Sequence, residues 1–527
     1  MKKFGLLLSF LLLTSCGVKE PTKIIVPTIP EEKQTIINFY CQNDVHGRIE
    51  QDLNENTGSV AQLSSYILNK QKSIPGYNVY LNAGDLWEDT YNSVKNKGAL
   101  LTECYRDMNF DAMALGNHEF DWGTEVIKEN QKLAKENNKD FTFLGANIYY
   151  FDEKNNQVLD HASDFCSKYK IIQRGDYKIG IIGAIGVSQI KSITSTNWTN
   201  LTFLDPVPIV KNLSDDLKVN HGCDVVVYLF HGNLASVGYE ELSKISSVSK
   251  SHYVDVGFLG HSHVFEDTLY NGVPWVQNGS HSSCLGRVSI DFKNNEHKVI
   301  YKSSRASRID DGYGNGVNSI FNSDEDINIR KTIDKYLTED FKKLRDEVIG
   351  CLEKDYFDNN FGAVAANLYN IAIDDYLAKM RKTLDIPEID VILNNGYRSN
   401  VILNNKDITR ENVFNSMPFL NNIVVCKVKG SDIINECINY SSVYYLPKKQ
   451  RLIIEKDKDY IVAGCDYVIL HKNLSREYDY FKSYNGAIAI FNKYPNDLIS
   501  DYIKEQGVIL YKDLKQNNVE FCGLSQK

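Results

Sequence analysis

The chain has 527 residues, a formal net charge of −9 and an ordinary hydrophobic content of 43%. A chain of this length exceeds what one hydrophobic core supports, so two domains are expected. The negative charge argues against a nucleic-acid polymer as partner, because such partners favour a basic face, but it allows a small anionic substrate wherever a metal ion supplies positive charge.

The first 34 residues predict export and anchoring. Lys2 and Lys3 precede an apolar run over residues 4–13, which is too short to cross a bilayer as a stable helix and is typical of a secretory signal. Residues 13–16 read Leu-Thr-Ser-Cys, which resembles the bacterial lipobox, where the chain is cut before a lipid-modified cysteine. We therefore expect a lipoprotein signal peptide over 1–15, a lipid on Cys16 that anchors the protein to the bacterial membrane outside the cytoplasm, and a tether over 16–34. An ordinary signal peptide with an incidental cysteine is the alternative.

Short apolar runs then alternate with helical stretches. This alternation predicts a layered α/β domain over residues 35–305. The strand candidates are apolar or β-branched runs of the usual strand length, and they occupy residues 36–41, 78–82, 179–185, 225–230, 256–259 and 287–292. The two helix candidates between them are residues 58–70 and 124–137.

A polar, glycine-containing stretch over residues 303–323 ends this pattern. Apolar residues at spacings of three and four then predict one connecting helix over 324–349, inside a linker over 306–350. A second α/β domain is expected over 351–527, and its clearest strand candidates are residues 391–393 and 423–428.

Five short motifs place polar side chains at or near the ends of predicted strands. They read Asn-Asp-Val-His-Gly at 43–47, Ala-Gly-Asp at 83–85, Leu-Gly-Asn-His-Glu-Phe-Asp at 115–121, Leu-Phe-His-Gly at 229–232 and Gly-His-Ser-His at 260–263. Loops at the carboxyl edge of an α/β sheet are where ligands bind. Carboxylate, amide and imidazole ligands suit zinc or manganese better than copper(I) or an iron–sulfur cluster. Each motif alone is commonly a turn, a surface loop or a helix cap, but the five together predict a metal site.

The order of these motifs resembles the calcineurin-like metallophosphoesterase superfamily, and more narrowly the bacterial 5'-nucleotidase family. The resemblance implies a β-sandwich flanked by helices as catalytic domain, followed by a second α/β domain that binds substrate. It also implies two divalent metal ions, zinc or manganese. The ligands carried over from the family are Asp44, His46, Asp85, Asn117, His231, His261 and His263.

The resemblance further divides these ligands between the two ions. One ion would take Asp44, His46, Asp85 and His263, and the other would take Asp85, Asn117, His231 and His261. Asp85 would bridge the two, which is a role that a carboxylate with two oxygens can fill. Two such ions lower the pKa of a shared water and neutralise phosphoryl charge.

His118 is not a ligand in this assignment. By resemblance to the family, it faces the leaving oxygen as an acid or charge stabiliser, and Asp121 orients it.

In the second domain, residues 391–398 read Val-Ile-Leu-Asn-Asn-Gly-Tyr-Arg and resemble the nucleotidase substrate motif. The resemblance implies that Asn394 and Arg398 bind substrate, since a guanidinium suits bidentate contact with phosphate or a ribose edge; a solvated arginine in a turn is the alternative. The glycine run before Arg398 is shorter than in the family, and the arginine expected near residues 355–360 is missing.

The family clamps the nucleobase between two aromatic rings, each beside a glycine-containing motif that this chain lacks. Tyr445 and Tyr480 lie where the rings are expected, and Tyr480 is preferred because residues 479–481 partly match the second motif. A ring that stacks on a base contributes about 1–3 kcal/mol to binding.

These features predict an enzyme that releases phosphate from nucleoside 5'-monophosphates outside the cytoplasm. A 2',3'-cyclic nucleotide phosphodiesterase or a nucleotide-sugar hydrolase is the alternative among enzymes. A non-catalytic surface-binding lipoprotein that retains the fold is the alternative from another class, although such a protein would not need His118 with Asp121.

Overall fold

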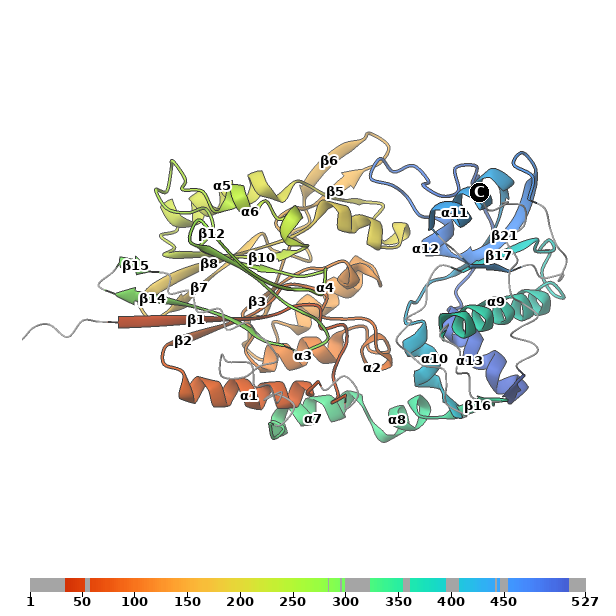
Figure 1. Cartoon of the computed structure of the whole chain (residues 1–527), viewed down its shortest axis with the longest axis horizontal. Coiled ribbons are helices and arrows are strands. Elements are labelled where there is room, and N and C mark those ends of the chain that lie inside the picture. Colours follow the sequence, from red (N-terminus) through yellow and green to blue (C-terminus); the bar gives the residue numbers. More distant parts are fainter. Residues whose placement is uncertain are drawn as a thin grey trace, which may run out of the picture.

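The computed structural model describes residues 34–52, 57–282, 284–293, 296–298, 323–353, 361–394, 407–440, 443–445 and 454–510. Two groups of elements lie side by side in Figure 1, the first coloured red to green and the second teal to blue. Several expected features lie outside the described residues. They are the signal peptide, the lipid on Cys16, nearly all of the tether, the domain boundary at residue 305 and Arg398.

Two six-stranded sheets face each other in the first group. One has the order β15-β14-β1-β2-β3-β4, and the other has the order β12-β13-β11-β10-β8-β7. The strands of the first sheet are β1 (Gln34–Gln42), β2 (Tyr77–Asn82), β3 (Ala112–Ala114), β4 (Thr142–Leu144), β14 (Gly286–Lys293) and β15 (Glu296–Lys298). Those of the second are β7 (Tyr169–Arg174), β8 (Tyr177–Ile185), β10 (Val225–His231), β11 (Val256–Leu259), β12 (Phe265–Tyr270) and β13 (Val273–Asn278).

The core of this sandwich lies between the two sheets, where fully buried side chains such as Phe39, Val227 and Phe258 belong to one cluster. Helices cover both outer faces (Figure 1). The first sheet packs against α1 (Val60–Ser73), α3 (Ala99–Asp107) and α4 (Thr124–Leu133), and the second against α5 (Pro206–Val219) and α6 (Tyr239–Leu242). The expected layered fold, a β-sandwich flanked by helices, is therefore confirmed.

The strands nearest the site run parallel. β1 pairs with β2, and β10 pairs with both β8 and β11, in parallel register. Strands covered on both faces read as continuous apolar runs, which is why the sequence predicted these segments well. Because parallel strands end at the same edge, the loops that follow them come together there.

The connecting segment differs from the single helix predicted over 324–349. It consists of α7 (Ile327–Tyr336), α8 (Glu339–Arg345) and the strand β16 (Val348–Leu352). Leu337 ends α7 with a non-helical backbone and is buried in the first domain, and the Thr338 hydroxyl then caps α8. The apolar stripe continues across this break, so periodicity alone could not reveal it.

The second domain is also α/β, as expected. Its five-stranded sheet has the order β20-β17-β21-β19-β22, formed by β17 (Val391–Asn394), β19 (Ile423–Lys429), β20 (Val443–Tyr445), β21 (Asp459–Cys465) and β22 (Ala487–Phe491). One face packs on α9 (Phe361–Met380) and α13 (Pro495–Gln506), and the other on α11 (Gly430–Tyr440) and α12 (Asp466–Ile469). A small sheet joins β16 to β18 (Asp407–Thr409) and β23 (Val508–Ile509).

Within the described ranges, contacts between the two domains include a pair of aromatic rings and an arginine. The Tyr91 ring, in α2 (Tyr91–Val94), meets the ring of Phe414, in α10 (Arg410–Ser416), with centroids 5.3 Å apart. On the other side, Arg476 of the second domain donates to the Thr199 carbonyl oxygen at 2.7 Å and stacks 3.8 Å from the Phe151 ring centroid. Tyr91 and Phe414 lie in short helices, whereas Phe151 lies in β5 (Ile148–Asp152), a strand of a small three-stranded sheet.

None of the helices that the structure describes carries an apolar stretch of the length and composition needed to span a membrane.

Candidate metal centre

The carboxyl ends of β1 and β2 place two acidic loops side by side. The backbone N–H of Asp44 donates to the Gly84 carbonyl at 2.9 Å, and that of His46 donates to the Asp85 carbonyl at 3.1 Å. Gly84 has a φ of +96°, and a Cβ there would lie 2.5 Å from Nδ1 of His231. Glycine is therefore required where this loop crosses the histidine from the second sheet.

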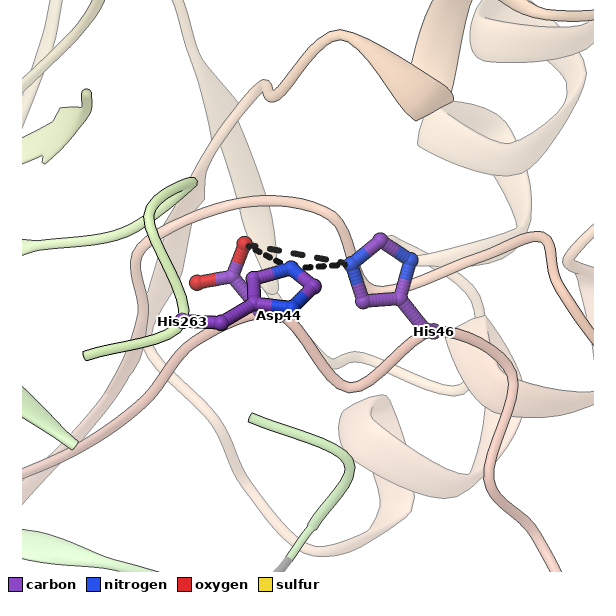
Figure 2. Close-up of side chains that lie close together, drawn as sticks. All are labelled: Asp44, His46 and His263. Atoms are coloured by element: carbon purple, nitrogen blue, oxygen red, sulfur yellow. Dashed lines mark hydrogen bonds and ion pairs between the residues drawn. The ribbon is translucent and has the colours of Figure 1, made fainter. Parts of the chain in front are cut away.

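The first ligand group joins Asp44, His46 and His263, which converge in Figure 2. The Nε2 atoms of the two histidines lie 2.9 Å apart. Oδ1 of Asp44 lies 3.4 Å from Nε2 of His263 and 3.9 Å from Nε2 of His46. Three atoms that can each offer a lone pair to a metal ion thus lie close together, which is an arrangement that a shared cation would stabilise.

The second ligand group joins Asp85, Asn117, His231 and His261. Nδ1 of His231 donates to the Ala83 carbonyl at 2.9 Å, so in the neutral ring Nε2 carries the lone pair. That Nε2 faces Oδ1 of Asn117 at 3.2 Å and Oδ2 of Asp85 at 3.1 Å, which are both acceptors. Nδ1 of His261 lies 3.0 Å from the same Asn117 oxygen.

Asp85 lies between the two groups. Its Oδ2, which contacts His231 in the second group, is 3.9 Å from Nε2 of His46 in the first. Its Oδ1 accepts the backbone N–H of His118 at 3.0 Å. All seven residues expected as ligands are thus brought together, with Asp85 where a bridging carboxylate would stand.

Charge in this cluster is unbalanced without a cation. Burial opposes the charged form of His231, but Asp85 and then Asp44 raise its pKa to about 9. An extra proton would therefore occupy the same place between acceptors that a metal ion would fill. Neutral imidazoles and carboxylate and amide oxygens make a donor set that fits two divalent ions.

His118 and Asp121 stand beside this cluster. Nδ1 of His118 contacts Oδ2 of Asp121 at 2.7 Å, and the His118 ring lies 5.1 Å from that of His46, edge to face. Burial disfavours the charged imidazole, but Asp121, Asp85 and Glu88 together raise the pKa of His118 well above its usual value. The expected pair is therefore present, and its geometry suits an imidazole that carries a proton.

Five of the seven expected ligands have left-handed backbones. The φ angles are +49° at Asp44, +51° at His46, +52° at Asp85, +74° at His261 and +56° at His263. Such conformations are costly for residues other than glycine and concentrate at functional sites. The strained backbone conformations of these loops thus direct the ligand side chains toward the candidate metal site.

Glu119 is a site residue that the sequence did not reveal. Its fully buried carboxylate accepts backbone N–H groups from Asp85, Leu86, Trp87 and Gly116 at 2.7–3.2 Å. It therefore joins the loop after β2 to the loop after β3. The Glu in Asn-His-Glu at 117–119 was the available signal, but the four donors that it serves come from loops that meet only in the fold.

His281 and Glu88 were also missed. The His281 ring lies 5.6 Å from that of His46 and 5.5 Å from that of His263, and its backbone N–H donates to the Asp44 carbonyl at 2.7 Å. It follows β13 closely, so the strand-end rule could have found it. Oε2 of Glu88 lies 3.7 Å from Nδ1 of His118.

The expected substrate residues belong to the second domain. Asn394 ends β17, and Arg398 and the side chain of Tyr445 lie outside what the structure describes. The Tyr480 ring stacks on His471, with centroids 4.3 Å apart and planes 19° apart. Nε2 of His471 in turn contacts the Lys191 carbonyl of the first domain at 3.1 Å, so Tyr480 stands near the junction between the domains.

Comparison with known proteins gives matches over both domains. The chain is 27% identical over 439 residues to the 5'-nucleotidase of Bos taurus, which covers 74% of this chain and 69% of the relative. It is 31% identical over 242 residues to that of Homo sapiens, covering 44% and 38%.

Solved structures share the whole fold. The 5'-nucleotidase precursor of Thermus thermophilus superposes with a TM-score of 0.64 at 18% identity, covering 90% of this chain and 97% of that one. The 5'-nucleotidase of Candida albicans gives 0.58 at 15% identity, covering 89% and 98%.

A family model for calcineurin-like phosphoesterases matches residues 37–265. This range contains most of β1 and all of β2, β3, β4, β7, β8, β10 and β11, together with all seven expected metal ligands, His118 and Asp121. Over these residues, which are fewer than half of the chain, the first domain is similar to the calcineurin-like phosphoesterases.

Proposed function

We propose that the chain is a metal-dependent phosphoester hydrolase that converts nucleoside 5'-monophosphates to nucleosides and phosphate. The observation that carries the proposal is the convergence of two ligand groups on Asp85 beside a His118–Asp121 pair. Support for nucleotides as substrates comes from relatives named 5'-nucleotidase that align over most of the chain.

Asp44, His46 and His263 would hold one ion with Asp85, and Asn117, His231 and His261 would hold the other with the same carboxylate. When bound, two such ions activate water and neutralise the charge of the phosphoryl group. Zinc and manganese both suit these ligands.

His118 would hold a proton for the oxygen that leaves. Asp121 accepts from Nδ1 and thereby fixes the ring, which leaves Nε2 as the atom that gives the proton to the leaving oxygen. Asn394, Arg398 and Tyr480 would bind the nucleotide from the second domain, Arg398 through phosphate or ribose and Tyr480 by stacking on the base.

Phosphate release from purified protein tests this function. Nucleoside 5'-monophosphates, 2',3'-cyclic nucleotides, nucleotide sugars and sugar phosphates would each be assayed with zinc and with manganese. We expect the monophosphates to be hydrolysed with the highest kcat/KM. Preferential hydrolysis of a cyclic nucleotide or a nucleotide sugar would assign one of those activities instead, and binding without turnover of any substrate would favour a surface-binding role.

The site of action that we propose is outside the cytoplasm, with a lipid on Cys16 holding the chain at the membrane. The lipobox-like residues 13–16 support this location. Mass spectrometry of the mature protein should find a lipid-modified Cys16 at its N-terminus, and Cys16→Ala should leave the precursor uncut at this position. An unmodified N-terminus elsewhere would contradict the anchor.

A further inference from the structure

Glu88 lies in the turn that follows Asp85, deep inside the site. Its side chain is 1% exposed, and a buried carboxylate is costly unless positive or polar groups face it. Oε2 lies 3.7 Å from Nδ1 of His118. Glu88 forms one close group with His118 and Asp121, and a second with His46 and Asp89, in each of which the candidate ligand atoms lie within 4.8 Å of one another.

The backbone at Glu88 is held in an unfavourable conformation. Its φ is +79°, which costs about 1 kcal/mol or more for a residue with a Cβ. The turn is packed tightly against the loop that carries His46, since a Cβ on Gly47 would lie 2.0 Å from the Glu88 carbonyl oxygen. The Glu88 N–H donates to the Ser93 hydroxyl at 3.2 Å, which fixes the turn from the other side.

His46 needs an acceptor on the side of its ring away from the ligand cluster. Its Nε2 faces His263, Asp44 and Asp85. Its Nδ1 is buried and has no hydrogen-bond partner within the part of the chain that the structure describes. Histidines that bind metal through one nitrogen almost always donate the other N–H to a carboxylate, a carbonyl or water.

We infer that Glu88 is a positioning residue that couples the first metal site to His118. With the ion bound, its carboxylate would accept the Nδ1–H of His46, whose ring belongs to the same close group as Glu88, and so hold Nε2 toward the ion. The same carboxylate would hold Nδ1 of His118 in place together with Asp121. The two histidines, which lie edge to face at 5.1 Å, are thereby fixed by one side chain. This inference rests on the proposed metal site, but not on which phosphoester is hydrolysed.

Glu88→Gln tests the inference, because it keeps the size of the side chain and removes its charge. Calorimetric titration of manganese or zinc into the chelator-stripped full-length protein should show metal affinity weakened about 10–100-fold at one site. At saturating metal, kcat should remain lower than in the parent, more so for a nucleotide than for an aryl phosphate. The titration needs no substrate, so it decides the inference even if nucleotides prove not to be hydrolysed.

Glu88→Gly separates positioning from structural support. Glycine accepts the left-handed backbone without strain, so we expect the melting temperature of the metal-free protein to be unchanged or higher while metal affinity falls as in Glu88→Gln. Glu103→Gln is the matched control, since Glu103 is also buried in the first domain but pairs with Lys335; its metal titration should equal that of the parent.

Two results would overturn the inference. Metal titrations of both Glu88 variants that match the parent would show that the carboxylate does not orient His46. Weakened metal binding in Asp89→Asn, with normal metal binding in Glu88→Gln, would show that Asp89 and not Glu88 orients His46.

Discussion

Among single side chains, Asp85 bears most of the proposed chemistry. It is 1% exposed, its Oδ2 reaches histidines of both ligand groups, and its Oδ1 holds the backbone of His118. Although burial opposes ionisation, His231 and then His118 hold the pKa of Asp85 well below its usual value. A group that serves both sites should affect both when it is changed.

We therefore predict that Asp85→Asn loses or weakens two metals at once. The neutral amide offers one oxygen where the carboxylate offers two, and it removes a negative charge from both sites. Elemental analysis after gel filtration measures the metal content. Asp121→Asn, which changes a nearby carboxylate outside the ligand set, should retain both ions; two tightly held ions in Asp85→Asn would show that the bridging assignment is wrong.

His118 should affect turnover rather than metal binding. We predict that His118→Asn retains its metals and loses about 10²–10⁴ in rate, the range for a removed general acid. The loss should be smaller for an aryl phosphate, because its leaving group needs less assistance. Steady-state rates on a nucleotide and an aryl phosphate provide the comparison, and equal losses on both would exclude a role at the leaving oxygen.

At the scale of secondary-structure elements, the loops that follow the strands are held together by hydrogen bonds to their backbone N–H groups. Glu119 joins two of them through four N–H donors. In Glu119→Gln the amide NH₂ must replace one oxygen, and each buried donor left without an acceptor costs about 1–3 kcal/mol.

We predict that Glu119→Gln lowers the free energy of unfolding by about 2 kcal/mol or more and also weakens metal binding, because both loops carry ligands. Denaturant unfolding and a metal titration measure the two effects. Glu129→Gln on the exposed face of α4 should change neither. Normal stability in Glu119→Gln would mean that the loops hold their shape without this carboxylate.

The strands and the ligand motifs were predictable because each corresponds to a pattern of residues that are consecutive in the sequence. β10 and β11 are apolar runs covered on both faces, and the ligands follow such strands directly. Glu88 and Glu119 could not be found in this way, since their partners come from other loops, whereas His281 closely follows β13 and could have been found by the same rule. The break at Leu337 was hidden because α7 and α8 continue one apolar stripe while packing in different surroundings.

In the molecule as a whole, the proposed chemistry and the proposed recognition of substrate are assigned to different domains. The ligands, His118 and Asp121 come from the first domain, whereas Asn394, Arg398 and Tyr480 come from the second. The connecting segment is divided in the same way, because α7 packs into the first core and β16 pairs within the second domain. α8 stands between them and lies where relative movement of the domains would be absorbed.

This division leads to a prediction for Arg398→Ala. We expect unchanged metal content and a raised KM for nucleotides with little change in kcat, which is the sign of lost binding shared by ground and transition states. Rates on a small aryl phosphate, which offers no ribose or base, should change less. Unchanged nucleotide kinetics would mean that this residue does not read the nucleotide, and the broader phosphoesterase function would then replace the nucleotidase one.

The left-handed backbone conformations of the expected ligand residues also have a consequence for the amount of folded protein that accumulates. Five of the expected ligands have left-handed backbones, and Asp44 and Asp85 bring two carboxylates into one cluster, so we expect the folded chain to be less stable without bound ions than with them. Ions that bind only the folded state stabilise it by mass action, and weakly stable chains are those that proteases remove. We therefore expect metal supply in the surroundings to set how much of this protein accumulates, independently of how fast it is made.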